Sequence, residues 1–153
     1  QGDYVYAEIP KPRLVAAKPT PGMNASGSAV KAIVDRWNVD LPEMLVIVDD
    51  VDLPLGTLRI RPHGGDGCHR GMESVIYHLK DNRFPRLRFG IATDEDLRPA
   101  ENYVLKPFRK QDRRLAEEMV STAADAVETI VYQGLNKAMN LFNRTNKTME
   151  NYS

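Results

Sequence analysis

Cysteine is nearly absent from this sequence, and its scarcity limits the kinds of fold that the chain can adopt. Cys68 is the only cysteine among the 153 residues. One thiol cannot build an internal disulfide framework, nor can it supply the set of cysteine ligands of a structural zinc site. The composition therefore favours a reducing compartment, and we expect the cytoplasm rather than secretion.

Long apolar runs and an excess of one charge are missing as well. No stretch approaches the roughly 20 apolar residues that a membrane helix needs, and no basic region followed by an apolar stretch marks a signal peptide. Basic and acidic residues both number 21, whereas nucleic-acid-binding domains are usually strongly basic. Local clusters must therefore carry any such function; the candidates are Arg59, Arg61, Arg70, Arg83, Arg86 and Arg88. A solvated mixed surface explains the same pattern.

The length fits one domain that spans residues 1–153 and buries roughly 70% of the surface of its unfolded chain. No repeat, low-complexity segment or linker indicates a second domain. The first segment, Tyr4–Ile9, already alternates like a strand, so we expect the sequence to begin inside its domain. The polar tail 146–153 is expected to fray.

Hydrophobic patterning predicts alternating strands and helices, which is typical of an α/β fold. The predicted strands are 4–9, 13–17, 44–48, 57–61, 86–92 and a short one at 103–105. The apolar run 44–48 predicts a strand that is buried on both faces. Helices are expected after the capping residues Ser26 and Ser28, from about His69 to Leu79, and from Gln111 onward with an interruption at Gly134.

A glycine-rich loop precedes the second predicted helix and is the most informative single stretch. Glycines let a backbone approach a ligand, and the amino end of a helix attracts anions such as phosphate. The loop lacks the Lys-Ser/Thr of a P-loop and the spacing of a dinucleotide fingerprint. His69, at the start of the helix, is a candidate donor or acid; a hydrogen-bonded surface histidine is the alternative.

Polar residues also occur at the end of the predicted strand 44–48 and in the turn before the first predicted helix. Asp49, Asp50 and Asp52 come after the apolar strand, where open α/β sheets place working residues. Asp49 and Asp50 would point to opposite faces if the strand persists, which disfavours a metal site. Met23 and Asn24 fall in the turn before the first helix, where Asn24 is either a site residue or a helix-start residue.

Four motifs occur together and in order along the chain: KPTPGMNASG (18–27), VDDVDLPLG (48–56), GGDGCHRG (64–71) and RLRFGI (86–91). Two further segments, YVLKP (103–107) and GLNKA (134–138), continue the pattern. This sequence of motifs closely resembles the bacterial peptidyl-tRNA hydrolase family over nearly the whole chain. The resemblance implies a single α/β domain with a mixed, mostly parallel sheet flanked by helices.

The resemblance also implies an activity and residues for it. Members hydrolyse the ester between a peptide and the 3′ end of tRNA, without a metal or other cofactor. Asn24, beside Met23, would hold the peptide or position water, Asp49 would orient a catalytic histidine, and His69 would contact the substrate near the scissile bond. Arg70, the next residue, would bind the tRNA together with His69. Arg61 and Arg88 match positions that clamp the tRNA 5′ phosphate beside the acceptor stem.

Three departures from the family pattern affect this interpretation. The first strand of the family, with its Asn-Pro-Gly turn, and the Arg-His-Asn segment that carries the general-base histidine have no counterpart here. Cys68 stands where glycine is common, and Arg70 where asparagine is common. We therefore expect a monomeric hydrolase of which this chain is an amino-terminally truncated form with little turnover. A non-hydrolytic RNA-binding relative, similar to splicing factors of this fold, and an inactive fragment are the alternatives.

Overall fold

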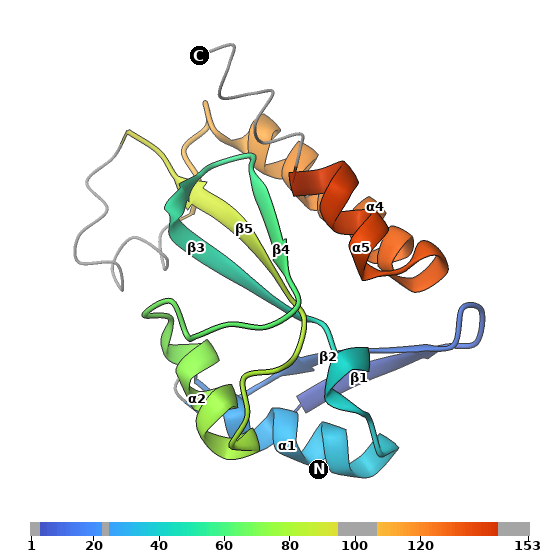
Figure 1. The fold of residues 1–153 in the computed structure, drawn as a ribbon. Coiled ribbons are helices and arrows are strands. Elements are labelled where there is room, and N and C mark those ends of the chain that lie inside the picture. Colours follow the sequence, from blue (N-terminus) through green and yellow to red (C-terminus); the bar gives the residue numbers. More distant parts are fainter. Residues whose placement is uncertain (1–3, 23–24, 95–106, 144–153) are drawn as a thin grey trace. The chain divides into compact units, whose positions relative to one another are not determined.

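The computed structural model describes residues 4–22, 25–94 and 107–143. The chain divides into two compact units. The first comprises Gln1–Val46 and Pro62–Pro85, and the second comprises Ile47–Arg61 and Arg86–Ser153. Each unit has a sheet and helices of its own (Figure 1).

The elements agree closely with the predicted pattern. The strands are β1 (Tyr4–Ile9), β2 (Leu14–Pro19), β3 (Val46–Pro54), β4 (Leu58–Arg61) and β5 (Arg86–Ala92). The helices are α1 (Ser26–Trp37), α2 (Arg70–Leu79), α4 (Arg113–Gln133) and α5 (Leu135–Ala138), with a short 3₁₀ helix η2 (Leu41–Glu43) and a short π-helix η3 (Met139–Asn143). The α/β class is thus confirmed, while the predicted strand 103–105 and the tail from 146 lie outside the described residues. In the described part of the chain, no helix has both the length and the apolar character to cross a bilayer.

In the first unit, the hairpin of β1 and β2 is fastened to the end of α1 by aromatic contacts. The strands pair antiparallel from Tyr4 opposite Pro19 to Ile9 opposite Leu14, as predicted. The Arg36 guanidinium lies 4.5 Å from the centre of the Tyr6 ring and 4.4 Å from that of Trp37. It also donates a 2.7 Å hydrogen bond to the Tyr6 hydroxyl. Because a cation above an aromatic face is attracted by the ring, Arg36 joins helix and hairpin.

Helices α1 and α2 lie side by side (Figure 1), and Gly27 is so close to α2 that an added Cβ would lie 2.0 Å from the Ser74 carbonyl oxygen. The Gly27 N–H donates a 2.9 Å hydrogen bond to the Ser74 hydroxyl of α2. The expectation that Ser26 or Ser28 caps α1 is wrong, because Ala25 occupies the N-cap position and no side chain caps it. The hydroxyl of Ser28 instead donates to the Ala25 carbonyl. Ser74 therefore satisfies, from another helix, one of the N–H groups that a helix start leaves unpaired.

In the second unit, β5 lies between β3 and β4. β4 and β5 are antiparallel. β3 and β5 run parallel, since hydrogen bonds join their starts (Val46 N–H to the Pro85 carbonyl) and their ends (Leu55 N–H to the Ala92 carbonyl). A Cβ atom added to Gly90 would lie 2.1 Å from the Pro54 carbonyl oxygen, so glycine is required where β3 and β5 approach.

Strand β3 differs from its prediction in burial and in length. Ile47 is 48% exposed, so the strand is not buried on both faces. Among the described strands β3 pairs with β5 alone, so the backbone on its other side has no strand partner there. The strand also continues beyond the apolar run to Pro54, because pairing with β5 holds its backbone extended. Asp49, Asp50 and Asp52 therefore lie within the strand rather than after it.

The apolar side of the β4–β5 pair forms the core of the second unit. Leu58, Ile60 and Leu87 are at most 2% exposed. The amide side chain of Asn143 accepts from the Ile60 N–H at 2.9 Å and donates to the Ile60 carbonyl at 3.1 Å. Asn143 thus pairs with the backbone of β4 as a neighbouring strand would, which protects that sheet edge.

Replacing Gly27 with alanine tests the contact between α1 and α2. An added Cβ would lie 2.0 Å from the Ser74 carbonyl oxygen, so we expect Gly27→Ala to lower the free energy of unfolding by about 1–3 kcal/mol, the usual cost of overpacking. Denaturant unfolding measures this change. Gly65→Ala is the control, because a Cβ there would meet nothing within 4 Å. Equal stability of the two variants would contradict the close contact.

Candidate functional site

His69 is the N-cap residue of α2, as its position in the sequence predicts. Its Nδ1 atom accepts a 3.1 Å hydrogen bond from the Met72 N–H. An acceptor nitrogen carries no proton, so this bond assigns the proton of the neutral ring to Nε2. The imidazole is half-buried. His69 can therefore present Nε2–H as a donor while its ring is fixed by the helix that it caps.

The loop that leads to His69 is shaped by its own polar groups. The Asp66 carboxylate accepts from the Cys68 N–H at 2.9 Å, and the Asp66 carbonyl accepts from the His69 N–H at 3.0 Å. Gly67 and Cys68 have φ values of 58° and 60°, in the left-handed region. These bonds turn the chain sharply into α2. Arg70, the first residue of the helix, is exposed.

Met23 and Asn24 lie outside the described residues. The helix that follows them is nevertheless tied to α2 within the first unit, through the bond between Gly27 and Ser74. Reasoning from the sequence missed Ser74 as a positioning residue. A glycine inside a helical pattern is the signal that could have indicated a close packing contact at Gly27.

In the second unit, Asp49 and Asp50 are consecutive half-buried residues of β3. Because successive side chains of a strand point to opposite faces, the persistence of the strand separates their carboxylates as expected. Asp50 lies 3.8 Å from Arg88 of β5, measured from Oδ2 to Nη1, and accepts from the Asp52 N–H at 2.8 Å. Asp50 is thus on the same face as Arg88, and Asp49 points to the other face. Nowhere in residues 4–22, 25–94 and 107–143 do three or more His, Cys, Asp or Glu side chains gather as metal ligands.

Four arginines share one face of the β4–β5 pair, which we call the arginine face: Arg59, Arg61, Arg86 and Arg88. The register places Arg59 opposite Arg88 and Arg61 opposite Arg86. Arg61 and Arg88, both predicted to bind tRNA, are therefore diagonal neighbours at about 7–8 Å. Arg86 is 1% exposed, and its pKa is lowered by burial and by the nearby charge of Arg88.

The predicted site residues thus fall into two groups. His69 and Arg70 belong to the first unit, and Asp49, Arg61 and Arg88 belong to the second. Within the second unit the fold brings Arg61 and Arg88 onto one face, together with Asp50, which the sequence had not singled out for this place.

Comparison with known proteins identifies the family. A family model described as peptidyl-tRNA hydrolase matches residues 1–151. The chain belongs to the peptidyl-tRNA hydrolase family. This membership confirms the resemblance on which the predicted activity rests.

Curated relatives in the same family come from bacteria and a plant. The peptidyl-tRNA hydrolase of Persephonella marina is 39% identical over 86% of this chain and 69% of its own length. That of Desulforudis audaxviator is 45% identical over 86% of this chain and 66% of its own length. The chloroplastic peptidyl-tRNA hydrolase of Arabidopsis thaliana is 39% identical over 99% of this chain and 52% of its own length. The chain therefore spans between about half and about two thirds of these relatives.

Solved structures support the same fold. A variant of the peptidyl-tRNA hydrolase of Acinetobacter baumannii matches with a TM-score of 0.80 and 25% identity, over 92% of this chain and 71% of that one. The enzyme of that organism without the substitution matches with a TM-score of 0.78 and 24% identity. The peptidyl-tRNA hydrolase fold predicted from the motifs is thus confirmed.

The backbone explains one departure from the family pattern. Cys68 has a φ of 60°, where a side chain is strained and glycine is not. The glycine that is common at this position suits the turn into α2, whereas Cys68 adopts it at a cost of about 1–2 kcal/mol. The exposed thiol of Cys68 thus stands directly before His69.

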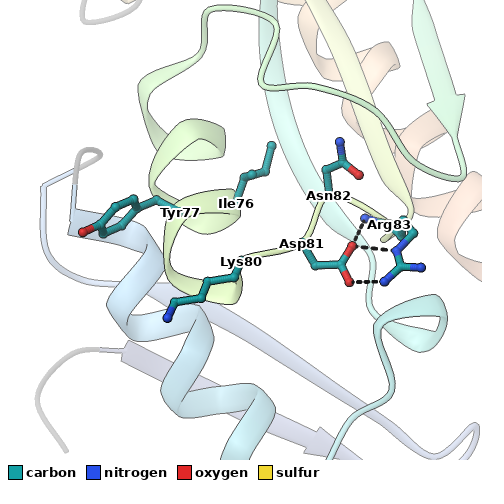
Figure 2. A pocket seen from close by; sticks show the side chains of 6 residues that line it. All are labelled: Ile76, Tyr77, Lys80, Asp81, Asn82 and Arg83. Carbon is teal, nitrogen blue, oxygen red and sulfur yellow. Dashed lines mark hydrogen bonds and ion pairs between the residues drawn. The ribbon is translucent and has the colours of Figure 1, made fainter.

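An open depression lies at the carboxyl end of α2, lined by Ile76, Tyr77, Lys80, Asp81, Asn82 and Arg83 (Figure 2). It contains none of the predicted site residues and lies about 15 Å along the helix from His69. Figure 2 shows the side chain of Arg83 turned onto Asp81, with bonds of 2.9 Å from Nε and 2.8 Å from Nη2. Within the first unit, the depression is therefore separate from His69.

Asp81 provides a test of this ion pair through its titration. Hydrogen bonds from the side chain and N–H of Arg83 lower the pKa of Asp81 from 3.8 to about 2. The pair therefore contributes stability above pH 3.8, and this contribution is lost as the pH falls through about 2. We expect Arg83→Gln to raise the pKa of Asp81 part of the way back toward 3.8, because the side-chain bonds are lost while the N–H of residue 83 still donates; NMR titration of the carboxyl carbon measures it. Lys80→Gln, in the same depression, should leave it low; an unchanged pKa in Arg83→Gln would refute the pairing.

Substitutions of His69 separate its capping role from its imidazole. We expect His69→Ala to lower the free energy of unfolding by about 1 kcal/mol, because the Met72 N–H loses its acceptor. His69→Asn should retain most of the stability, since asparagine is a good N-cap residue. Denaturant unfolding of both variants measures the difference. A fully stable His69→Ala variant would show that the bond to Met72 does not hold the ring.

Proposed function

We propose that the protein containing this chain hydrolyses peptidyl-tRNA, cleaving the ester between a peptide and the 3′ end of tRNA and so recycling tRNA from stalled translation. The observation that carries the proposal is the family match over residues 1–151. Two features of the units support it: the imidazole held at the start of α2 and the paired strands that carry Arg61 and Arg88.

Ester hydrolysis needs a base that activates water and donors that stabilise the developing oxyanion. A water oxygen bonds to the carbonyl carbon, the bond from that carbon to the 3′ oxygen breaks, and the tRNA hydroxyl leaves with a proton. His69 is suited to a donor role near the scissile bond, because its Nδ1 is occupied by the Met72 N–H and its Nε2 carries the proton. Asn24 would hold the peptide or position the water.

Asp49 would orient the general-base histidine, since a carboxylate behind an imidazole fixes its tautomer and orientation. In the family this histidine belongs to an Arg-His-Asn segment without a counterpart in residues 1–153. The reaction as proposed needs no metal. We therefore propose that residues 1–153 alone have little turnover and that the upstream histidine completes the site.

The tRNA would be bound mainly through phosphates. Arg61 and Arg88 share one sheet face, and guanidinium groups match the geometry of phosphate oxygens. They would clamp the 5′ phosphate beside the acceptor stem, with His69 and Arg70 nearer the 3′ end. Recognition would follow the shape of the tRNA rather than its sequence. We further propose that the enzyme acts as a monomer in the cytoplasm, a reducing compartment that suits the lone Cys68.

Release of labelled peptide from peptidyl-tRNA tests the activity. The assay compares this chain with a form extended upstream to include the Arg-His-Asn segment, each with and without Asp49→Asn. We expect turnover in the extended form and a loss of about a hundredfold or more on changing Asp49, the range that general-base catalysis supplies.

Asp52→Asn is the matched control, because Asp52 is an exposed acid of the same strand. It should leave turnover within a few-fold of the unchanged form. Absence of turnover in both forms, with salt-sensitive tRNA binding retained, would favour a non-hydrolytic RNA-binding relative instead.

A further inference from the structure

Two guanidinium groups of the arginine face, those of Arg59 and Arg61, have no acid partner in the part of the chain that the structure describes. Within residues 4–22, 25–94 and 107–143, Arg88 contacts the Asp50 carboxylate at 3.8 Å. No ion pair or hydrogen bond of the Arg59 or Arg61 side chain is found in the same part of the chain. Both are residues of β4, two positions apart, and Arg59 lies directly opposite Arg88.

This arrangement is unfavourable for the protein by itself. Like charges directly opposite one another in a sheet are destabilising, and Arg59 is a half-buried arginine opposite another arginine. The backbone of β4 is nevertheless fixed by pairing with β5 and by both hydrogen bonds of Asn143 to Ile60. Arg59, Arg61 and Arg88 are thus held on a rigid surface, with Asp50 3.8 Å from Arg88, and such a concentration of positive charge suits a polyanionic ligand.

We propose that Arg59 binds a phosphodiester of the tRNA acceptor stem next to the terminal phosphate bound by Arg61 and Arg88. The inference rests on the proposed function and extends its binding surface by one residue. Side chains two residues apart on a strand are separated by about 7 Å, so Arg59 and Arg61 present their charges to separate phosphates along one nucleic-acid strand.

The chemistry of duplex RNA favours a backbone contact over a base contact. Side chains cannot read the deep, narrow major groove of A-form RNA, and shape recognition uses phosphates and 2′-hydroxyls. The contact of Arg59 should therefore be independent of tRNA sequence and sensitive to salt.

Binding of two forms of one tRNA distinguishes this contact from the terminal clamp. The ligands are a tRNA with its 5′ phosphate and the same tRNA after enzymatic removal of that phosphate. Arg59→Gln should weaken binding of both forms about tenfold and reduce the slope of log Kd against log salt by about one. Arg61→Gln should weaken binding of the phosphorylated form only. The measurements use this chain and the upstream-extended form.

Two further variants serve as controls. Arg114→Gln removes an exposed arginine of α4, in the same unit, and should leave Kd unchanged. Arg59→Lys keeps the charge and should restore most of the affinity, which a purely structural role of the arginine would not explain. Thermal unfolding of each variant establishes that the binding changes are not changes of folding.

The outcomes separate this inference from the proposed function. An effect of Arg59→Gln that disappears with the dephosphorylated tRNA, or no effect at all, would overturn the separate phosphodiester contact. Peptide release by the extended form would still support the hydrolase in that case. If that form bound tRNA through Arg59 yet released no peptide, the binding contact would stand and the proposed activity would fail.

Discussion

The pairing of β5 with two neighbouring strands is the constraint on which the second unit depends. β5 joins β3 on one side and β4 on the other, so it brings the acids of β3 and the arginines of β4 to a single sheet. β3 can approach β5 closely because Gly90 has no side chain; an added Cβ there would collide with the Pro54 carbonyl. The same strand carries Arg88, whose contact with Asp50 joins β5 to β3. Binding groups on this sheet are therefore positioned by the backbone ladder that stabilises it.

A corresponding contact organises the first unit. The bond from the Gly27 N–H to the Ser74 hydroxyl joins α1 to α2 at the point where a side chain on residue 27 would not fit. α2 in turn is capped by His69, whose ring orientation is fixed by the Met72 N–H. Capping, helix packing and presentation of the imidazole thus depend on one another, because each relies on the position of α2. Strain at Cys68 is part of the cost of this turn.

Local sequence features predicted most helices and strands correctly, because the formation of these elements depends largely on residues that are neighbours in the chain. The bounds of β5, the hairpin of β1 and β2, and the end of α4 at Gly134 agree with the patterning. The motifs also identified the family, which the match over residues 1–151 confirms. Burial was less predictable: an apolar run such as 44–48 is typical of a central strand, yet Ile47 is 48% exposed, because the cover over a strand's faces comes from elements far away in the chain.

By itself, the sequence determined the α/β class, the family, the helix that begins after His69, and the alternation that separates Arg59 and Arg61 from Leu58 and Ile60. These follow from local periodicity, from glycine and proline, and from motif order. Tertiary structure alone decided that Ser74 accepts from the Gly27 N–H of α1, that Asn143 covers the edge of β4, and that Asp50 rather than Asp49 meets Arg88. Such contacts join residues far apart in the chain, and their partners are selected by strand register and helix packing, which no local pattern specifies.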